Sequence, residues 1–243
     1  MTMRSMTKST LQVAKVKVGR SPTVLQRVGR SRSFNNKQVV SNKSDLVVEG
    51  FPRSGNTYIC GAIEVANRGR LSVASHFHVA GQLRLAEKLG KPCVIVIREP
   101  IDALSSTMVY HRWLSPTAAL IWYVDFYEAA LSCESPIYVA EFQRATTCVG
   151  EVVEEASRCL GIGMRAPSRE DEAEIRQYVQ NAARVWTRHK GGVLQDRVSY
   201  PVAGRREEKE RLEATLTRGR YSRLVGRARH LYEQLVARSA EPE

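Results

Sequence analysis

A glycine-containing turn between an apolar run and a helical pattern is the first segment expected to do chemistry. It spans residues 50–57 and reads GFPRSGNT. Because it follows a predicted strand and opens a predicted helix, its successive backbone N–H groups can converge on an anion at the helix N-terminus. The pattern therefore predicts a phosphate cradle, with the Arg53 side chain as a cation beside the bound group.

This turn departs at one position from the loop that nucleoside triphosphatases use. Asn56 stands where the GxxxxGK[ST] pattern requires lysine. Without that lysine a β/γ-phosphate pair loses its main cationic contact, and the chain shows no strand-borne Asp that would complete a magnesium site. Hydrolysis of ATP or GTP is therefore disfavoured, and no metal site is expected. A Pro-Gly turn that binds no ligand is the alternative reading of this motif alone.

A second candidate residue, Arg98, comes directly after the apolar run 94–97. An arginine at the carboxyl end of a strand points into the crevice where open α/β sheets bind ligands. The following residues suit a helix, on which Ser106 would lie about two turns along and could meet the same anion as Arg98. A surface ion pair of Arg98 with Asp102 or Glu99 is the alternative.

The elements that must position these residues alternate between strands and helices. The expected strands are residues 46–49, 92–97 and 136–140, and the expected helices are 58–66, 79–89, 149–160, 168–186 and, in a charged C-terminal part, 205–238. Short apolar strands alternating with helices are typical of a parallel sheet that is buried on both faces. The fold class is therefore α/β: a three-layer, P-loop-like fold with a central, mostly parallel sheet flanked by helices.

Length and charge set the expected domain organisation. The chain has 243 residues, 43% of them hydrophobic, which suffices for one sizeable core. Ten basic residues and no acid lie in residues 1–44, so the formal charge of +12 is concentrated there and the remainder is nearly neutral. We therefore expect a basic, disordered N-terminal arm over 1–44 and a single domain over 45–243 with a helical C-terminal part.

Composition also limits which binding partners and which cellular compartment are expected. The arm lacks the aromatic residues that stack on bases, so no specific nucleic-acid partner is expected. No apolar run reaches the roughly 18 to 20 residues that a membrane span needs, which predicts a soluble protein. The five cysteines form no CxxC or Cys/His cluster, which favours a reduced, cytoplasmic setting without a zinc site. An organelle is the alternative if residues 1–44 are a transit peptide.

In these motifs the chain resembles the sulfotransferases that use 3′-phosphoadenosine-5′-phosphosulfate (PAPS). Residues 52–57 (PRSGNT) match the family's loop for the 5′-phosphosulfate, and residues 98–100 (REP) with Ser106 are similar to its segment for the 3′-phosphate. Residues 75–78 (SHFH) stand where cytosolic members have their catalytic histidine. Residues 188–192 (RHKGG) resemble the C-terminal element that closes over the 3′-phosphate.

The resemblance implies a role for each of these residues. His76 would be the general base, and Arg53 would neutralise the departing phosphate oxygen. PAPS, and its product 3′-phosphoadenosine-5′-phosphate (PAP), would be held by a larger set: Arg53, Ser54, Gly55, Asn56, Thr57, Tyr58, Arg98, Ser106, Arg188, Lys190 and Gly191. No metal would be needed, because a sulfuryl group carries less charge than a phosphoryl group. His78, Glu64 and Glu99 are alternative bases.

Departures from the family pattern keep other functions open. Ala74 replaces a lysine that often precedes the catalytic histidine, and Ala140 stands where an aromatic residue commonly flanks adenine. The expected function is transfer of a sulfuryl group from PAPS to a hydroxyl or amine of a small-molecule or carbohydrate acceptor, with a homodimer left open. A small-molecule P-loop kinase and a non-catalytic nucleotide-binding module are the alternatives.

Overall fold

The computed structural model describes residues 3–29, 38–189, 192–193 and 205–240. The strands are β1 (Leu46–Gly50), β2 (Val73–Ser75), β3 (Cys93–Ile97), β4 (Ile137–Glu141), β5 (Arg188–His189) and β6 (Gly192–Val193). The helices are α1 (Met3–Val18), α2 (Pro22–Gly29), α3 (Asn56–Asn67), α4 (Ala80–Lys88), α5 (Pro100–Tyr110), α6 (Pro116–Leu131), α7 (Phe142–Thr147), α8 (Val149–Leu160), α9 (Glu172–Thr187), α10 (Arg206–Leu216) and α11 (Ser222–Ala240), with a 3-10 turn η2 (Gly219–Tyr221) before α11.

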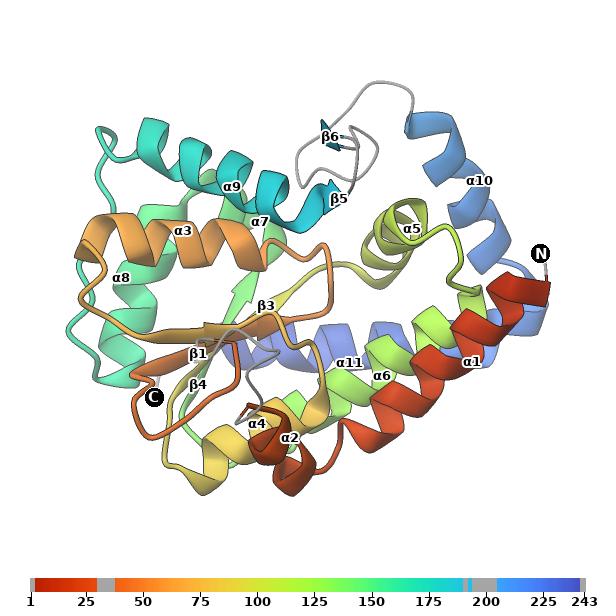
Figure 1. Cartoon of the computed structure of the whole chain (residues 1–243), viewed down its shortest axis with the longest axis horizontal. Helices are drawn as coiled ribbons and strands as arrows, with labels where there is room; N and C mark the ends of the chain where they lie inside the picture. Colours follow the sequence, from red (N-terminus) through yellow and green to blue (C-terminus); the bar gives the residue numbers. More distant parts are fainter. Residues whose placement is uncertain (1–2, 30–37, 190–191, 194–204, 241–243) are drawn as a thin grey trace.

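A parallel sheet with strand order β2-β1-β3-β4 forms the centre of the molecule (Figure 1). In its register Val48 of β1 lies opposite Ser75 of β2 and Val94 of β3. Because the strands run in one direction, β1 and β3 end at the same edge of the sheet. The turn after β1 and Arg98 after β3 are thereby neighbours, and the predicted α/β class is confirmed.

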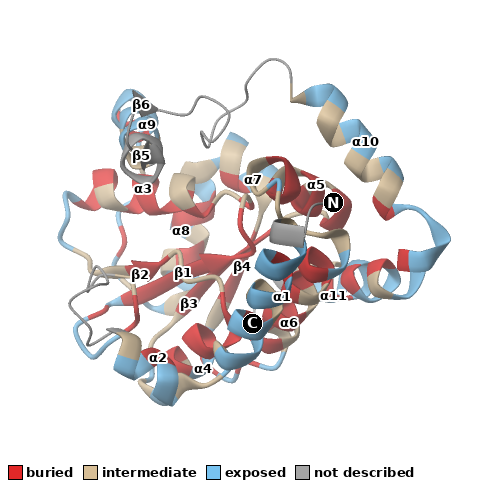
Figure 2. Ribbon diagram, turned by 45° about the vertical axis from the view of Figure 1, so that its right-hand side comes forward, coloured by how far each residue is buried: buried red, intermediate tan, exposed pale blue. Residues whose placement is uncertain are grey.

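Side chains alternate between the two faces of the sheet, and each face has its own core. Val47 and Ile95 pack with residues of α1, α2, α4, α5, α6 and α11, whereas Val48 and Val96 pack with residues of α3, α8 and α9. All four are fully buried. Figure 2 shows the buried strands between helices whose outer sides are exposed. The molecule therefore has the three layers that the apolar strands predict.

Helix α6 is the main element that the sequence patterns do not reveal. Its sequence, PTAALIWYVDFYEAAL, is apolar on almost every side, so no alternation of polar and apolar faces marks it as a helix. It packs against α1, α4, α5 and α11 and buries Tyr123, Phe126 and Tyr127 completely. Being surrounded explains its composition, because a helix without a solvent face needs no polar stripe.

The structure corrects the expected disorder of residues 3–29. Helices α1 and α2 lie along α6 and α4 (Figure 1), with Val16 and Leu25 buried between them. Ser9 Oγ donates a hydrogen bond of 2.7 Å to the carbonyl oxygen of Trp113, and the Arg20 guanidinium pairs with the buried carboxylate of Asp125. The basic composition of residues 3–29 gives no indication of this packing, because their few apolar residues meet their partners only in the folded chain. The assignment of residues 45–243 to one domain stays a prediction.

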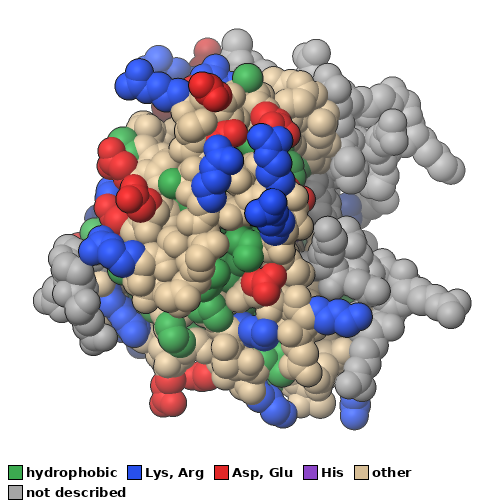
Figure 3. Space-filling model, turned by 90° about the vertical axis from the view of Figure 1, so that its left-hand side faces the viewer, with side chains coloured by type: hydrophobic (Ala, Val, Ile, Leu, Met, Phe, Trp, Pro, Cys, Tyr) green, Lys and Arg blue, Asp and Glu red, His purple; other side chains and the backbone are tan. Residues whose placement is uncertain are grey.

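The described surface mixes charges of both signs. Figure 3 shows one face of the molecule, on which Lys and Arg side chains are interspersed with Asp and Glu. Among the described residues, no helix combines the length and the apolar character that crossing a bilayer requires.

Candidate functional site

The turn after β1 has the backbone of an anion cradle. Arg53 and Gly55 take positive φ values of 68° and 98°, which reverses the chain so that α3 can begin at Asn56. No side chain caps this helix start, and the N–H groups of residues 55–57 have no backbone acceptor within the described residues. Uncapped N–H groups at a helix N-terminus are donors available to a bound anion.

Side chains from α5 and α6 hold this turn in place. Thr107 Oγ1 donates a 2.9 Å hydrogen bond to Pro52 O. The Tyr127 hydroxyl accepts from Phe51 N at 3.1 Å and donates to Val96 O at 2.8 Å, so it bridges the turn to β3. These bonds are buried. The cradle is therefore built on rigid elements rather than on a free loop.

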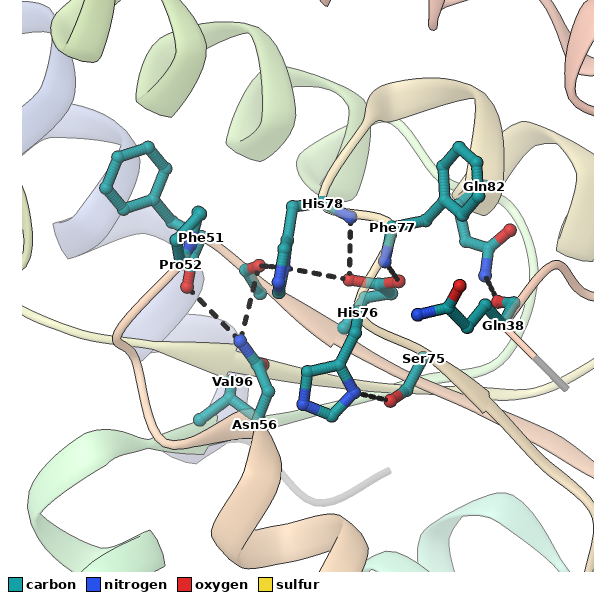
Figure 4. A network of polar contacts seen from close by, with 12 residues as sticks. Gln38, Phe51, Pro52, Asn56, Ser75, His76, Phe77, His78, Gln82 and Val96 are labelled. Atoms are coloured by element: carbon teal, nitrogen blue, oxygen red, sulfur yellow. Dashed lines mark hydrogen bonds and ion pairs between the residues drawn. The ribbon is translucent and has the colours of Figure 1, made fainter. Parts of the chain in front are cut away.

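Asn56, the residue that replaces the lysine of triphosphatases, turns its side chain back into the turn. Its Nδ2 donates to Phe51 O at 3.2 Å and to Gly50 O at 3.5 Å (Figure 4). The carboxamide is buried and closes the turn after β1. Asn56 can therefore serve an anion through its backbone N–H, while its side chain stabilises the shape of the cradle.

Arg53, Arg98 and Ser106 come together at the end of the sheet. Arg98 Nη1 donates a 2.7 Å hydrogen bond to Arg53 O, and Arg53 Nε donates to Ser106 Oγ at 3.5 Å. The Arg98 side chain is only 14% exposed. The predicted meeting of the turn, the end of β3 and the first helix after it is thus present in the structure.

Arg98 also makes the ion pair that was the alternative reading. Its Nε lies 2.5 Å from Asp102 Oδ2, and Lys209 of α10 pairs with the same carboxylate. Burial alone would raise the pKa of Asp102, but hydrogen bonds from Arg98 and Lys209 outweigh that effect and lower it. The ionised carboxylate of Asp102 is therefore shared by Arg98 and Lys209, and Lys209 also pairs with Glu213 at 3.5 Å.

Arg205 is a third arginine at the site, and the sequence patterns do not single it out. Burial, together with the positive charges of Arg205 and Arg98, lowers the pKa of Arg53 to about 10. Like charges lie close together only where other interactions hold them in place. A cluster of arginines therefore favours the binding of an anion. Arg205 lies more than 100 residues from the other two, so only the folded chain reveals it.

Phe142 is a second residue of the site that the sequence patterns miss. Its ring lies under the Arg98 guanidinium, with Cζ 4.0 Å from the ring centroid. A Cβ atom added at Gly55 would lie 3.2 Å from the same ring. Phe142 follows β4 directly, so a signal was available: an aromatic residue at the carboxyl end of the next parallel strand. It orients Arg98 by a cation–π contact and packs against the cradle.

His76 contacts the last residue of the cradle. Its Nε2 lies 3.0 Å from Thr57 Oγ1, and its Nδ1 contacts Ser75 Oγ. Burial and the neighbouring His78 lower the pKa of His76 to about 4, although Glu49 acts to raise it. The imidazole is therefore neutral at pH 7 and able to accept a proton. An ordinary histidine has a pKa near 6.5, so burial sets His76 apart from an exposed histidine.

Glu49 organises the segment that carries the histidines. Its carboxylate is fully buried, accepts hydrogen bonds from Phe77 N at 2.7 Å and from His78 N at 3.1 Å, and lies 3.2 Å from His78 Nδ1. His78 Nδ1 is also 2.7 Å from Gly50 O. The signal in the sequence was an acid inside the apolar strand LVVEG. Glu49 thus joins β1 to the segment after β2, while His78 faces the strand end.

The two glutamates proposed as alternative bases lie at the start of α5 and within α3. Glu99 Oε2 accepts from Asp102 N at 2.7 Å and so caps the first turn of α5. Glu64 lies in the third turn of α3, where its Oε1 is 3.2 Å from the position of a Cβ at Gly69. Of the two histidines, His76 contacts the Thr57 hydroxyl at the start of α3, whereas His78 contacts the carbonyl oxygen of Gly50 at the end of β1.

Unusual backbone angles mark the same site independently. Among the described residues, four non-glycine residues have positive φ, and three of them are Arg53 (68°), His76 (67°) and His78 (55°). Such conformations cost on the order of 1 to 3 kcal/mol each and persist where surrounding contacts impose them, often at functional sites. Their concentration around one turn supports a functional role for this edge of the sheet.

The structure describes the remaining predicted site residues only in part. Ser54 is buried within the turn, and Tyr58 is partly buried against the core on the α3 side of the sheet. The backbone of Arg188 lies in β5, which pairs with β6, but its side chain is not among those the structure describes. Lys190 and Gly191 lie outside the described residues.

Two hollows lie away from this site. One, of about 290 Å³, is lined at the far end of α3 by Ala66, Asn67, Arg68, Arg70, Leu71, Gly163 and Arg165. The other, of about 320 Å³, is lined by Arg84, Glu87, Ala129, Ser132, Cys133 and Glu134. Neither includes a residue of the cradle, so the chemical arrangement and not a deep cavity identifies the candidate site.

Comparison with known proteins finds similarity at the level of structure. No family model and no curated protein sequence matches the chain. Among solved structures it is similar to a crystal structure of the mouse sulfotransferase SULT7A1 complexed with PAP, with 11% sequence identity and a TM-score of 0.39 over 80% of this chain and 91% of that chain. At that identity and TM-score, functional inference has to come from the site geometry.

Proposed function

We propose that the protein is a PAPS-dependent sulfotransferase. The observation that carries the proposal is the convergence of Arg53, Arg98 and Ser106 beside the uncapped start of α3. A ligand with a 5′-phosphosulfate and a 3′-phosphate needs two neighbouring anion sites. The N–H groups of residues 55–57 with Arg53 suit the first group, and Arg98 with Ser106 suits the second.

In the proposed reaction an acceptor hydroxyl or amine attacks the sulfur atom of PAPS. The new bond to sulfur forms as the bond between sulfur and the phosphate oxygen breaks, and PAP leaves. Arg53 neutralises the charge that develops on this oxygen, and the cradle N–H groups hold the 5′-phosphate in line with the attack. His76 takes the proton of the acceptor. The acceptor is a small molecule or a carbohydrate.

The low pKa of His76 is compatible with this role once the nucleotide is bound. In the protein alone, burial holds the pKa of His76 at about 4. A multiply charged anion next to Thr57 would raise it, because a nearby negative charge stabilises the imidazolium. We therefore expect His76 to become a stronger base in the complex than in the free protein.

A small-molecule kinase is disfavoured by the same contacts. Asn56 replaces the phosphate-binding lysine, and its side chain is engaged with carbonyl groups of the turn. The nearest strand acid, Glu49, is engaged with the backbone N–H groups of Phe77 and His78. Neither residue is placed to complete the magnesium–triphosphate site of a kinase.

Binding and turnover measurements on the full chain test the proposal. Isothermal titration calorimetry should show PAP binding at least about fivefold more tightly than AMP, since a charge-assisted contact to the 3′-phosphate contributes about 1 to 3 kcal/mol. Release of PAP from PAPS should depend on a hydroxyl or amine acceptor. Equal affinity for PAP and AMP contradicts the site. Turnover of ATP with magnesium, without turnover of PAPS, would establish a kinase. Tight PAP binding without transfer to any acceptor would establish a non-catalytic nucleotide-binding module.

A further inference from the structure

The large apolar side chains that stay exposed in the described part of the chain lie close together in the sequence. They are Met6, Leu11, Val18 and Val24, with exposed fractions between 37% and 56%. All four belong to α1 or α2. Single exposed apolar residues are ordinary, but a group of them confined to one surface segment marks a site of interaction.

Two of these residues form an apolar stripe on α1 with lysines on both sides. Leu11 and Val18 are seven positions apart, which places them one above the other on the same side of the helix. Lys8 and Lys15, also seven positions apart, follow one edge of the stripe, and Lys17 lies toward the other edge. All five residues are exposed. We call this surface the outer face of α1.

The opposite side of α1 fixes the direction in which the outer face points. Val16 is buried in the core that α1 shares with α6. Ser5 Oγ and Ser9 Oγ donate hydrogen bonds of 3.0 Å and 2.7 Å to the carbonyl oxygen of Trp113, which precedes α6. Figure 2 shows the exposed outer side of the helix. The stripe and its lysines are therefore presented on a rigid support before any partner binds.

Charge identifies the kind of partner that fits this face. Residues 1–44 hold ten basic residues and no acid. A second copy of the chain would bring the lysines of one α1 against those of the other, and α1 has no carboxylate to pair with them. A nucleic acid would match the charge but would leave the apolar stripe without a partner. An anionic lipid surface offers acidic headgroups to the lysines and an apolar layer to Leu11 and Val18.

We propose that the outer face of α1 docks on the surface of a bilayer that contains anionic lipids. In the docked state α1 lies in the plane of the interface and does not cross the bilayer. The side chains of Leu11 and Val18 enter the boundary between headgroups and acyl chains, while the three lysines contact the acidic groups of the lipids. The proposal does not depend on which nucleotide binds at the cradle, since no residue of α1 belongs to that site.

Co-sedimentation of the full chain with vesicles tests the proposal. Binding to vesicles of equimolar phosphatidylcholine and phosphatidylserine should be at least about tenfold tighter than binding to phosphatidylcholine alone, because each lysine at an anionic surface contributes about fivefold. Added salt should weaken the binding. Fluorescence of Leu11→Trp should be quenched further by brominated lipids, which reports insertion rather than adsorption. Lys88→Trp, at an exposed position of α4, is the control that should show no added quenching.

Further variants separate the charged contribution from the apolar one. Lys8→Gln combined with Lys15→Gln should weaken binding to the anionic vesicles by about 25-fold, roughly fivefold for each lysine. Leu11→Gln should weaken it at least about fivefold, because this change removes apolar surface from the interface. The matched control is Lys88→Gln, which removes an exposed lysine from α4 and should leave binding unchanged. Because the replaced side chains are exposed, thermal unfolding should be nearly the same for all variants.

Three results would overturn the proposal. The first is absent binding, or equal binding to the two kinds of vesicle, or binding that Leu11→Gln leaves unchanged. The second is a DNA duplex that binds as tightly as the anionic vesicles and is insensitive to Leu11→Gln, which would assign the lysines to a nucleic acid. The third is a dimer, detected by sedimentation velocity, that Leu11→Gln dissociates, which would assign the stripe to a contact between two copies of the chain.

Discussion

The Nη1 atom of Arg98 donates a 2.7 Å hydrogen bond to the backbone carbonyl oxygen of Arg53. This contact joins the end of β3 to the turn after β1, although the two residues are 45 positions apart. It places two guanidinium groups at one edge of the sheet. Because the carbonyl and Asp102 take only some of the five donors of Arg98, the remaining N–H groups are available to an anion.

Replacing Arg98 tests its role as the 3′-phosphate ligand. Arg98→Ala should weaken PAP binding by about 1 to 3 kcal/mol, the range for a charge-assisted hydrogen bond, with a smaller effect on AMP. Calorimetry gives both affinities. The matched control is Arg176→Ala on α9. Arg176 pairs with Glu172 at 2.8 Å, and this ion pair has the same four-residue spacing as Arg98 and Asp102. An equal loss for PAP and AMP would show that Arg98 acts only by shaping the turn.

Replacing His76 tests the proposed base. His76→Asn should lower turnover of PAPS by roughly 10²-fold while PAP affinity changes little, because a lost base removes an interaction made in the transition state. In the unmutated protein, kcat/KM should fall with acid around pH 4, the pKa of His76 in the free protein. The value of kcat should fall at a higher pH, because nucleotide binding raises the pKa of His76. The control is His230→Asn on the exposed side of α11. Turnover near that of the unmutated protein would exclude His76.

The same histidine should make stability depend on pH. Burial lowers the pKa of His76 from 6.5 to about 4 in the folded state, so between these values the unfolded chain binds a proton that the folded chain does not. The stabilising contribution is complete above pH 6.5 and is lost as the pH falls toward 4. Urea denaturation at pH 7 and pH 5 should show a larger loss of unfolding free energy for the unmutated protein than for His76→Asn, on the order of 2 kcal/mol. Identical losses would contradict the buried, neutral imidazole.

Glu49→Gln tests how the histidine segment is positioned. An amide keeps the shape of the carboxylate but turns an N–H₂ group toward backbone donors, which should cost about 1 to 3 kcal/mol of unfolding free energy. Turnover should fall while the PAP dissociation constant stays unchanged, because Glu49 bonds Phe77 and His78 and not the arginines. Glu151→Gln, on the exposed side of α8, serves as the control. Rescue of turnover by Glu49→Asp, or weakened PAP binding, would argue against this positioning role.

The glycine of the cradle can be compared with a glycine elsewhere. Gly55 has φ 98° and a Cβ there would lie 3.2 Å from the Phe142 ring, whereas Gly90 has φ 61° and an added Cβ would meet nothing within 4 Å. Both alanine variants should lose about 1 kcal/mol of stability from the positive φ. Only Gly55→Ala should also weaken PAP binding, measured by calorimetry. If both variants bind PAP alike, the shape of this turn is not what holds the ligand.

Much of the fold and part of the site follow from local patterns in the chain. The strands β1, β3 and β4 are short apolar runs, and a sheet buried on both faces requires that composition. The turn 50–57 is recognisable because glycine supplies the positive φ before a helix start. By contrast, α6 has no polar face to reveal it, and Glu49 has partners that lie 28 and 29 residues further along the chain.

By itself, the sequence determined the α/β class, the position of the cradle and the placement of Arg98 at a strand end, because each depends on neighbouring residues and on the direction of parallel strands. Only the tertiary structure decided that α1 and α2 pack on α6 and α4, that Arg205 and Phe142 join the site, and that burial lowers the pKa of His76. These features arise from contacts and desolvation between segments far apart in the chain, which no local pattern encodes.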